Sequence, residues 1–106
     1  MLYEDGKKII KQNFNTYQLS LDIEIILIDK SFDYKENYFL ALIKDEGKAK
    51  LTDMGKLSEF SGIDYLELEK LCLKHNLNLN GYIIEKDLEN IEDVNKFIAL
   101  FDEVCE

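Results

Sequence analysis

The chain contains no proline and no tryptophan, and it has one histidine, His75, and two cysteines, Cys72 and Cys105. Without proline, glycine, asparagine and aspartate are left to mark its turns. A single histidine disfavours nucleophilic catalysis by a His-activated group. Two cysteines in a chain that starts without a secretory segment are expected to be reduced thiols rather than a disulfide.

Long apolar runs are also missing. The longest aliphatic run, Ile25 to Ile28, is far too short to span a bilayer. The first residues carry acids at Glu4 and Asp5 and lack the apolar segment of a signal peptide. These features predict a cytoplasmic protein that does not insert into membranes.

Apolar and acidic residues are abundant instead. Hydrophobic residues make up 46% and charged residues 33% of the 106 residues, which argues against disorder and suits one domain over 1–106. The net charge is −9, from 22 acids and 13 bases. This charge disfavours direct binding to nucleic acid or to an anionic membrane, and it favours a basic protein partner or simply solubility.

Residues Tyr38 to Ile63 organise the chain. An apolar run, Tyr38 to Ile43, leads through Asp45-Glu46-Gly47 into a second short run, Ala49 to Thr52. This pattern predicts a β-hairpin that feeds directly into a helix. Lysines alternate with small or apolar residues over Lys48 to Thr52, which predicts an exposed or edge position for that arm.

Hydrophobic periodicity predicts the other elements. They are a helix over Glu4 to Tyr17, a strand over Leu19 to Ile28, a short helix over Gly55 to Phe60 with Leu57 and Phe60 on one side, a helix from Tyr65 to about Asn76, a small hairpin around Asn80-Gly81, and a final helix from Ile91 capped by Asn90. We expect an α+β fold, in which a small antiparallel sheet (about three strands plus a short hairpin) packs against two to three helices.

Five residues are predicted to have structural roles in turns. They are Asp53, Gly55, Gly62, Asn80 and Gly81. Asp-x-Gly at the end of a strand favours an Asx-turn that caps the next helix, and a catalytic carboxylate is the weaker alternative for Asp53. Asn-Gly between apolar residues is a strong hairpin signal.

No motif for chemistry stands out. Cys72 and His75 lie three apart on one helical face, but further metal ligands at a recognisable spacing are missing, so we favour packing over metal binding. There is no glycine-rich phosphate loop, no Gly-x-Ser-x-Gly and no His-Glu-x-x-His. We expect no cofactor and no enzymatic activity.

Acidic residues are concentrated near the end of the chain. From Glu85 onward there are eight acids and only two lysines. Carboxylates displayed on a rigid scaffold can imitate a row of phosphates, although a solvated helix face is the simpler interpretation. The residues expected to bind a partner in this way are Glu85, Asp87, Glu89, Glu92, Asp93, Asp102 and Glu103.

The stretch Leu51-Thr52-Asp53-Met54-Gly55, followed by Leu57 and Ser61-Gly62-Ile63-Asp64, resembles the bacterial and phage proteins grouped as domain-of-unknown-function family 1828. In that family a hairpin ends in Leu-Thr-Asp-x-Gly, and a leucine, a Ser-Gly-Val/Ile turn and a helix follow. A short hairpin at Leu79-Asn80-Gly81-Tyr82 and a closing helix extend the resemblance over roughly Ile23 to Val104. Met54 departs from the family, which usually has a polar or acidic residue there, and the first helix is shorter.

The resemblance implies a bacterial or phage cytoplasmic protein from a mobile element, and it carries no established activity. A small acidic phage protein without a catalytic motif is similar to the inhibitors that phages direct at host defence nucleases, including anti-CRISPR proteins. This is an analogy of size, charge and setting, not of motif.

Three functions follow from these observations. The leading hypothesis is a non-enzymatic inhibitor whose acidic face docks on a basic host protein that handles nucleic acid. The alternative is a structural or regulatory module, homodimeric in one version, that binds through an apolar patch with Tyr34, Tyr38 and Phe39. The third is a small hydrolase or nuclease that uses Asp53 and a metal.

Overall fold

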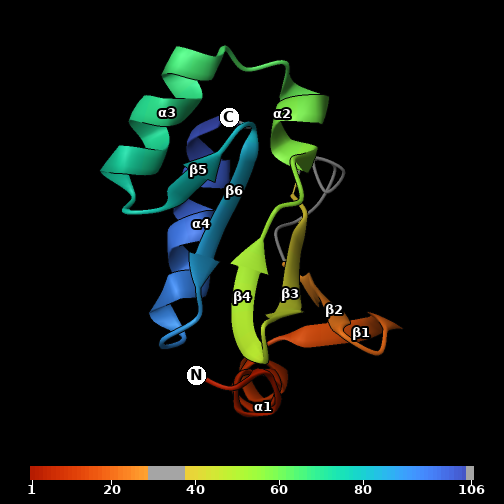
Figure 1. Ribbon diagram of the computed structural model, residues 1–106. Coiled ribbons are helices and arrows are strands. Elements are labelled where there is room, and N and C mark those ends of the chain that lie inside the picture. Colours follow the sequence, from red (N-terminus) through yellow and green to blue (C-terminus); the bar gives the residue numbers. More distant parts are fainter. Residues whose placement is uncertain (29–37, 105–106) are drawn as a thin grey trace.

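The computed structural model describes residues 1–28 and 38–104. It confirms the α+β class, with more strands than expected (Figure 1). In chain order the elements are α1 (Tyr3–Asn13), β1 (Asn15–Ser20), β2 (Ile23–Leu27), β3 (Leu40–Asp45), β4 (Lys48–Thr52), α2 (Lys56–Ser61), α3 (Tyr65–Lys74), β5 (Asn78–Asn80), β6 (Ile83–Asp87) and α4 (Glu92–Val104).

The strands form one sheet in the order β1-β2-β3-β4-β6-β5, and each neighbouring pair is antiparallel. The small second hairpin is therefore part of the main sheet, because β6 pairs with β4. Helices α2 and α3 make the connection from β4 to β5 around one end of the sheet (Figure 1).

The core lies between the sheet and α1 and α4. Side chains alternate between the two faces of a strand, so Leu42 and its partner Leu51 lie on one face with Leu40 and Ile26. Figure 1 shows α4 behind β5 and β6. The buried apolar residues include Ile10, Ile26, Leu40, Leu42, Leu51, Ile84, Leu88, Val94, Phe97, Leu100 and Phe101.

The first helix is shorter than the sequence predicts. It ends at Asn13, and Phe14 has an extended backbone with φ −139° and ψ 153°. The expectation that Tyr17 belongs to the helix is wrong, because Tyr17 lies in β1. Apolar residues at Ile10 and Phe14 fit a helical period, but Phe14 is already the residue at which the chain turns into the sheet.

The predicted single strand over Leu19 to Ile28 is also wrong. The chain reverses at Leu21-Asp22, and residues on both sides of this turn pair as β1 and β2, with Ser20 opposite Ile23. Neither turn residue is glycine or asparagine, and neither adopts a positive φ. The alternating pattern therefore continues through the turn without a break that marks it.

The charge on β2 is buried beneath α1. The Glu24 side chain is 1% exposed. Its carboxylate accepts a hydrogen bond from Thr16 Oγ1 at 2.8 Å, and its oxygens lie 3.9 Å from Lys7 Nζ and 3.5 Å from Lys11 Nζ. These lysines let α1 cover a carboxylate that would otherwise be costly to bury.

The predicted hairpin Tyr38 to Thr52 is present, although its first arm lies at Leu40–Asp45. Glu46 and Gly47 form its turn, both with positive φ. Of the exposed or edge position expected for β4, the edge alternative is wrong, because β4 lies between β3 and β6, although Lys48 is exposed. Lys50 Nζ is 2.9 Å from Asp45 Oδ2 and 3.6 Å from Glu85 Oε1, so acids on both neighbouring strands pair with the lysine that suggested an edge.

The later turns agree with the sequence in part. Gly62 has a φ of 67° where α2 ends, and Asp64 caps α3 by accepting a hydrogen bond from the Leu66 N–H. The β5–β6 turn is Gly81-Tyr82 rather than Asn80-Gly81, because Asn80 still pairs with Ile83. Phe60 was expected beside Leu57, but Leu57 is buried and Phe60 is exposed.

Asn90 caps the last helix, since its Oδ1 accepts a hydrogen bond from the Glu92 N–H at 2.9 Å. None of the helices in the described residues is both long and apolar enough to cross a membrane.

The close packing of α1 on β4 gives a testable prediction. A Cβ added at Gly6 would lie 2.7 Å from Ala49 Cβ and 3.0 Å from Leu88 Cδ2. We expect Gly6→Ala to lower the free energy of unfolding by about 1–3 kcal/mol, because the clash exceeds the gain of about 0.5–1 kcal/mol in helix propensity. Urea unfolding would measure the change.

A double-mutant cycle with Ala49→Gly provides the control. Removing the Ala49 Cβ removes the nearest atom, so the double variant should lose less stability than the two single variants together. If the two losses of unfolding free energy were strictly additive, the contact between Gly6 and Ala49 would not be the cause of the loss in Gly6→Ala.

Candidate functional site

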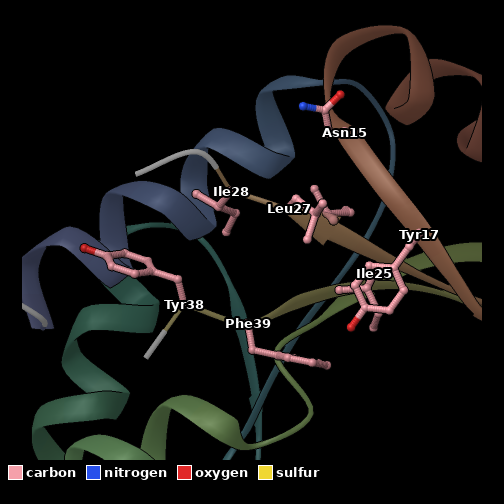
Figure 2. A pocket seen from close by; sticks show the side chains of 8 residues that line it. Asn15, Tyr17, Ile25, Leu27, Ile28, Tyr38 and Phe39 are labelled. Carbon is pink, nitrogen blue, oxygen red and sulfur yellow. The ribbon is translucent and has the colours of Figure 1, made fainter. Parts of the chain in front are cut away.

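A concave feature of the described residues lies where β1 and β2 meet the start of β3. We call it the β1–β2 depression, and its volume is about 440 Å³. Figure 2 shows Leu27 with Ile28 and Tyr38 on one side, Tyr17 and Ile25 on the other, and Phe39 below. Among the described residues it is lined by Asn15, Tyr17, Ile25, Ile26, Leu27, Ile28, Tyr38 and Phe39.

Strand pairing brings these residues together. Tyr17 lies opposite Ile25 and Asn15 lies opposite Leu27, so all four point to the same face of the β1–β2 hairpin. Tyr17 is 49% exposed and Leu27 is 45% exposed, whereas Ile25 is buried beneath them. The arrangement is an apolar surface with a polar amide at its rim.

A second, smaller depression adjoins the first. Its volume is about 320 Å³, and it is lined by Lys11, Gln12, Asn13, Phe14, Asn15 and Leu27. Asn15 and Leu27 belong to both depressions. The hollow surface therefore continues from the sheet around the start of β1 to the end of α1.

The predicted aromatic patch of Tyr34, Tyr38 and Phe39 is changed by the structure. Phe39 lines the β1–β2 depression, whereas Tyr34 lies outside the described residues. Tyr38 faces α4, where its hydroxyl donates to Asp102 Oδ1 at 3.0 Å and its ring packs edge-on against Phe101 at 5.7 Å between centroids. Tyr38 therefore anchors the end of the depression to α4.

Six of the seven predicted partner-binding acids contact another group of the protein among the described residues, and Glu85, Asp102 and Glu103 are three of them. Glu85 lies 3.6 Å from Lys50 Nζ, and Asp102 accepts from Tyr38. Glu103 Oε1 lies 2.9 Å from Lys74 Nζ and 2.6 Å from His75 Nε2. Hydrogen bonds from Lys74 and His75 hold the pKa of Glu103 below its usual value, although the group is in contact with solvent.

Asp93 was expected to project outward, and this expectation is wrong. It is 1% exposed. Its Oδ2 accepts hydrogen bonds from the backbone N–H groups of Glu89 and Asn90, and its Oδ1 lies 3.3 Å from Lys96 Nζ and 3.7 Å from Lys86 Nζ. Asp93 instead closes the turn that leads into α4.

Burial by itself raises the pKa of Asp93, but the two backbone donors, Lys96 and Lys86 lower it, and the net shift is downward.

The other three acids are exposed around the junction of β6 and α4. They are Asp87, Glu89 and Glu92. Glu89 lies 3.3 Å from Lys86 Nζ, and Glu92 accepts from Asn95 Nδ2 at 3.1 Å. The predicted acidic face is thus reduced to a short cluster of carboxylates.

Asp53 is fully buried at the end of β4. Its Oδ1 accepts from the Gly55 N–H at 2.8 Å and from the Ile84 N–H at 2.9 Å, and its Oδ2 accepts from the Leu57 N–H at 3.2 Å. This geometry agrees with the structural interpretation of Asp-x-Gly. Burial raises the pKa of Asp53, and the three backbone donors partly offset that rise.

Cys72 and His75 do not form a binding site in the structure. Cys72 is buried, and its burial, with the nearby Asp53 charge, raises the pKa of the thiol to about 11. His75 instead contacts Glu103. Among residues 1–28 and 38–104 no three His, Cys, Asp or Glu side chains are close enough together to hold a metal ion. Cys105 lies outside the described residues.

Sequence reasoning missed Asn15, Tyr17 and Leu27 because it placed Tyr17 in a helix and Leu27 in a single long strand. The available signal was the cluster of Asn13 and Asn15, which are poor helix formers and mark the end of α1.

Comparisons with known proteins add no identity to this geometry, since no family model, no curated protein and no solved structure matches the chain. The resemblance to family 1828 stays a prediction.

The Asp53 geometry predicts the effect of a nearly isosteric change. Asparagine keeps one acceptor oxygen but replaces the other with a donor, which leaves a buried N–H without a partner. We expect Asp53→Asn to lower the free energy of unfolding by about 1–3 kcal/mol. The control is Asp64→Asn at the start of α3, where asparagine is an equally good cap and the change should stay within about 0.5 kcal/mol. Equal losses in the two variants would contradict the prediction.

Adjacent acids in α4 give a second prediction. Asp93→Ala should cost about 2–4 kcal/mol at neutral pH, because it leaves two N–H groups without their acceptor and removes the carboxylate that pairs with Lys96 and, beside Glu89, with Lys86. Glu92→Ala, next to it and exposed, should cost less than about 1 kcal/mol. Urea unfolding of both variants and the parent chain is the measurement.

The loss of unfolding free energy in Asp93→Ala should depend on pH. Because the folded pKa of Asp93 is lowered, its contribution is complete above the unfolded pKa of about 3.9 and is lost as the pH falls through the folded pKa. The difference in unfolding free energy between the parent chain and Asp93→Ala should therefore become smaller below about pH 4. A difference in unfolding free energy that grows on acidification would contradict this prediction.

Proposed function

We propose that this chain is a non-enzymatic interaction module, structural or regulatory, that binds another protein through the apolar surface around the β1–β2 depression. The observation that supports this proposal is the exposure of Tyr17 and Leu27 beside a hollow that Ile25 and Phe39 also line. Apolar groups gathered at a concave surface are typical of binding sites.

The expected driving force is removal of apolar area from water. Each Å² covered contributes roughly 25 cal/mol before the costs of association. Asn15 at the rim supplies an amide that can donate to and accept from a partner backbone. With a net charge of −9, a protein is a better partner for this chain than nucleic acid.

Asp53 gives little support to the hydrolase or nuclease hypothesis. Each of its carboxylate oxygens already accepts at least one backbone N–H, and the side chain is buried. A metal or substrate would have to displace those donors from the end of β4.

The second candidate function is the acidic inhibitor that docks on a basic host protein, similar to anti-CRISPR proteins. Its support is the exposed cluster of Asp87, Glu89 and Glu92, which lies within a chain of strongly negative net charge. Binding of this kind should weaken as salt screens the charges, whereas apolar docking should not.

A capture experiment separates the two functions. The chain, immobilised, is exposed to bacterial lysate at low and high salt, and bound proteins are compared for three variants. Leu27→Asp should abolish capture, because a charge in the depression cannot be desolvated cheaply. Leu73→Asp, on the exposed face of α3, makes the same change elsewhere and should leave capture intact.

The third variant combines Asp87→Asn, Glu89→Gln and Glu92→Gln. Capture that is lost in this variant and at high salt, but kept in Leu27→Asp, would replace the apolar proposal by the acidic one. Capture that is equally affected by Leu27→Asp and Leu73→Asp would refute a role for the depression. Thermal unfolding of each variant would show that it is folded.

A further inference from the structure

Strand β1 is an edge strand of the sheet in the described part of the chain. It is the terminal strand of the sheet and has six residues, whereas β5 at the opposite edge has three. Within the described part of the chain, the backbone groups of β1 that point away from β2 have no hydrogen-bond partner. Such an edge is a template for another strand.

The usual protections of an edge strand are mostly missing from β1. It contains no lysine and no proline, and residues 12–21 carry no charge. Tyr17 and Leu19 are exposed on it. The register shift between Gln18 and Ser20 disturbs its end but leaves Asn15 to Gln18 in regular pairing with β2.

The distribution of charge around β1 favours a second copy of this chain as the partner of this edge. Two copies of a chain with net charge −9 repel each other, and a neutral seam keeps that repulsion smallest. Lys11 lies in the last turn of α1, just before β1, and Asp22 lies in the turn just after it. In an antiparallel pair the start of one strand meets the end of the other. Lys11 therefore lies at the same end of the seam as Asp22 of the second copy, and its half-exposed side chain also lies 3.5 Å from Glu24 of its own chain. A parallel pair would instead bring like charges together.

We propose that a second copy of this chain adds to β1 as an antiparallel strand, so that the two sheets join edge to edge about a two-fold axis. The axis runs perpendicular to the sheet, which keeps Tyr17 of both copies on one face and makes the two apolar surfaces continuous. The inference rests on the proposed function, since it names a partner for the surface that borders the β1–β2 depression.

The test is the self-association of the full chain, measured by sedimentation equilibrium from micromolar to about millimolar concentration. We expect a monomer–dimer equilibrium. Gln18→Lys places two like charges at the seam and should raise the dissociation constant at least about tenfold. Asn78→Lys makes a matched change on the other edge strand and should change the constant less than about twofold.

Hydrogen exchange identifies the contact. Amide protons in Asn15 to Gln18 should exchange more slowly as the concentration rises, and those of Asn78 to Asn80 should not. A chain that stays monomeric at all concentrations, or a dimer that Gln18→Lys does not weaken, overturns the proposal.

The outcome also separates this proposal from the proposed function. A monomeric chain whose capture of other proteins is abolished by Leu27→Asp keeps the function and loses the self-pairing. A dimer joined at β1 in a chain whose capture does not depend on Leu27 keeps the self-pairing and loses the function of the depression.

Discussion

The Asp53 carboxylate holds together three parts of the chain that are remote from one another. It accepts N–H groups from Gly55 in the turn after β4, from Leu57 in α2 and from Ile84 in β6. These bonds fix Met54 and Gly55 in left-handed conformations and begin α2 in a defined direction. The same side chain ties the second hairpin to the first, so that β6 can pair with β4 and α4 can cover the joined sheet. Burial of the Asp53 carboxylate costs free energy because it removes a charge from water. The hydrogen bonds that both oxygens accept offset this cost.

The negative charge of the chain has two different physical roles. Part of it is internal: Glu24 pairs with lysines of α1, Asp93 with Lys86 and Lys96, and Glu85 with Lys50. These carboxylates orient helices and turns. Most of the other acids among the described residues are exposed and keep the surface around the apolar residues of β1 and β2 hydrated. The apolar surface that we propose for docking and a strongly acidic composition are therefore compatible in one small fold.

Much of the fold was predictable because its signals are local. The β3–β4 hairpin follows from apolar runs around Glu46-Gly47, the cap at Asp64 from its spacing to the next helix, and α4 from a regular apolar stripe. The candidate surface was not predictable in the same way. The α1–β1 boundary at Phe14 has no glycine or proline, and the Leu21-Asp22 turn interrupts a pattern that still alternates. Only pairing between β1 and β2 shows that Tyr17 and Leu27 share a face.

The sequence alone determined the α+β class, the acidic character and the turn role of Asp53, since composition, period and short-range spacing are properties of neighbouring residues. The tertiary structure decided which carboxylates are buried and which are exposed, that β4 is an inner strand, and that β1 is an edge strand among the described residues. These depend on contacts between distant segments: a lysine indicates an exposed strand until acids on both neighbouring strands pair with it, as Asp45 and Glu85 do with Lys50.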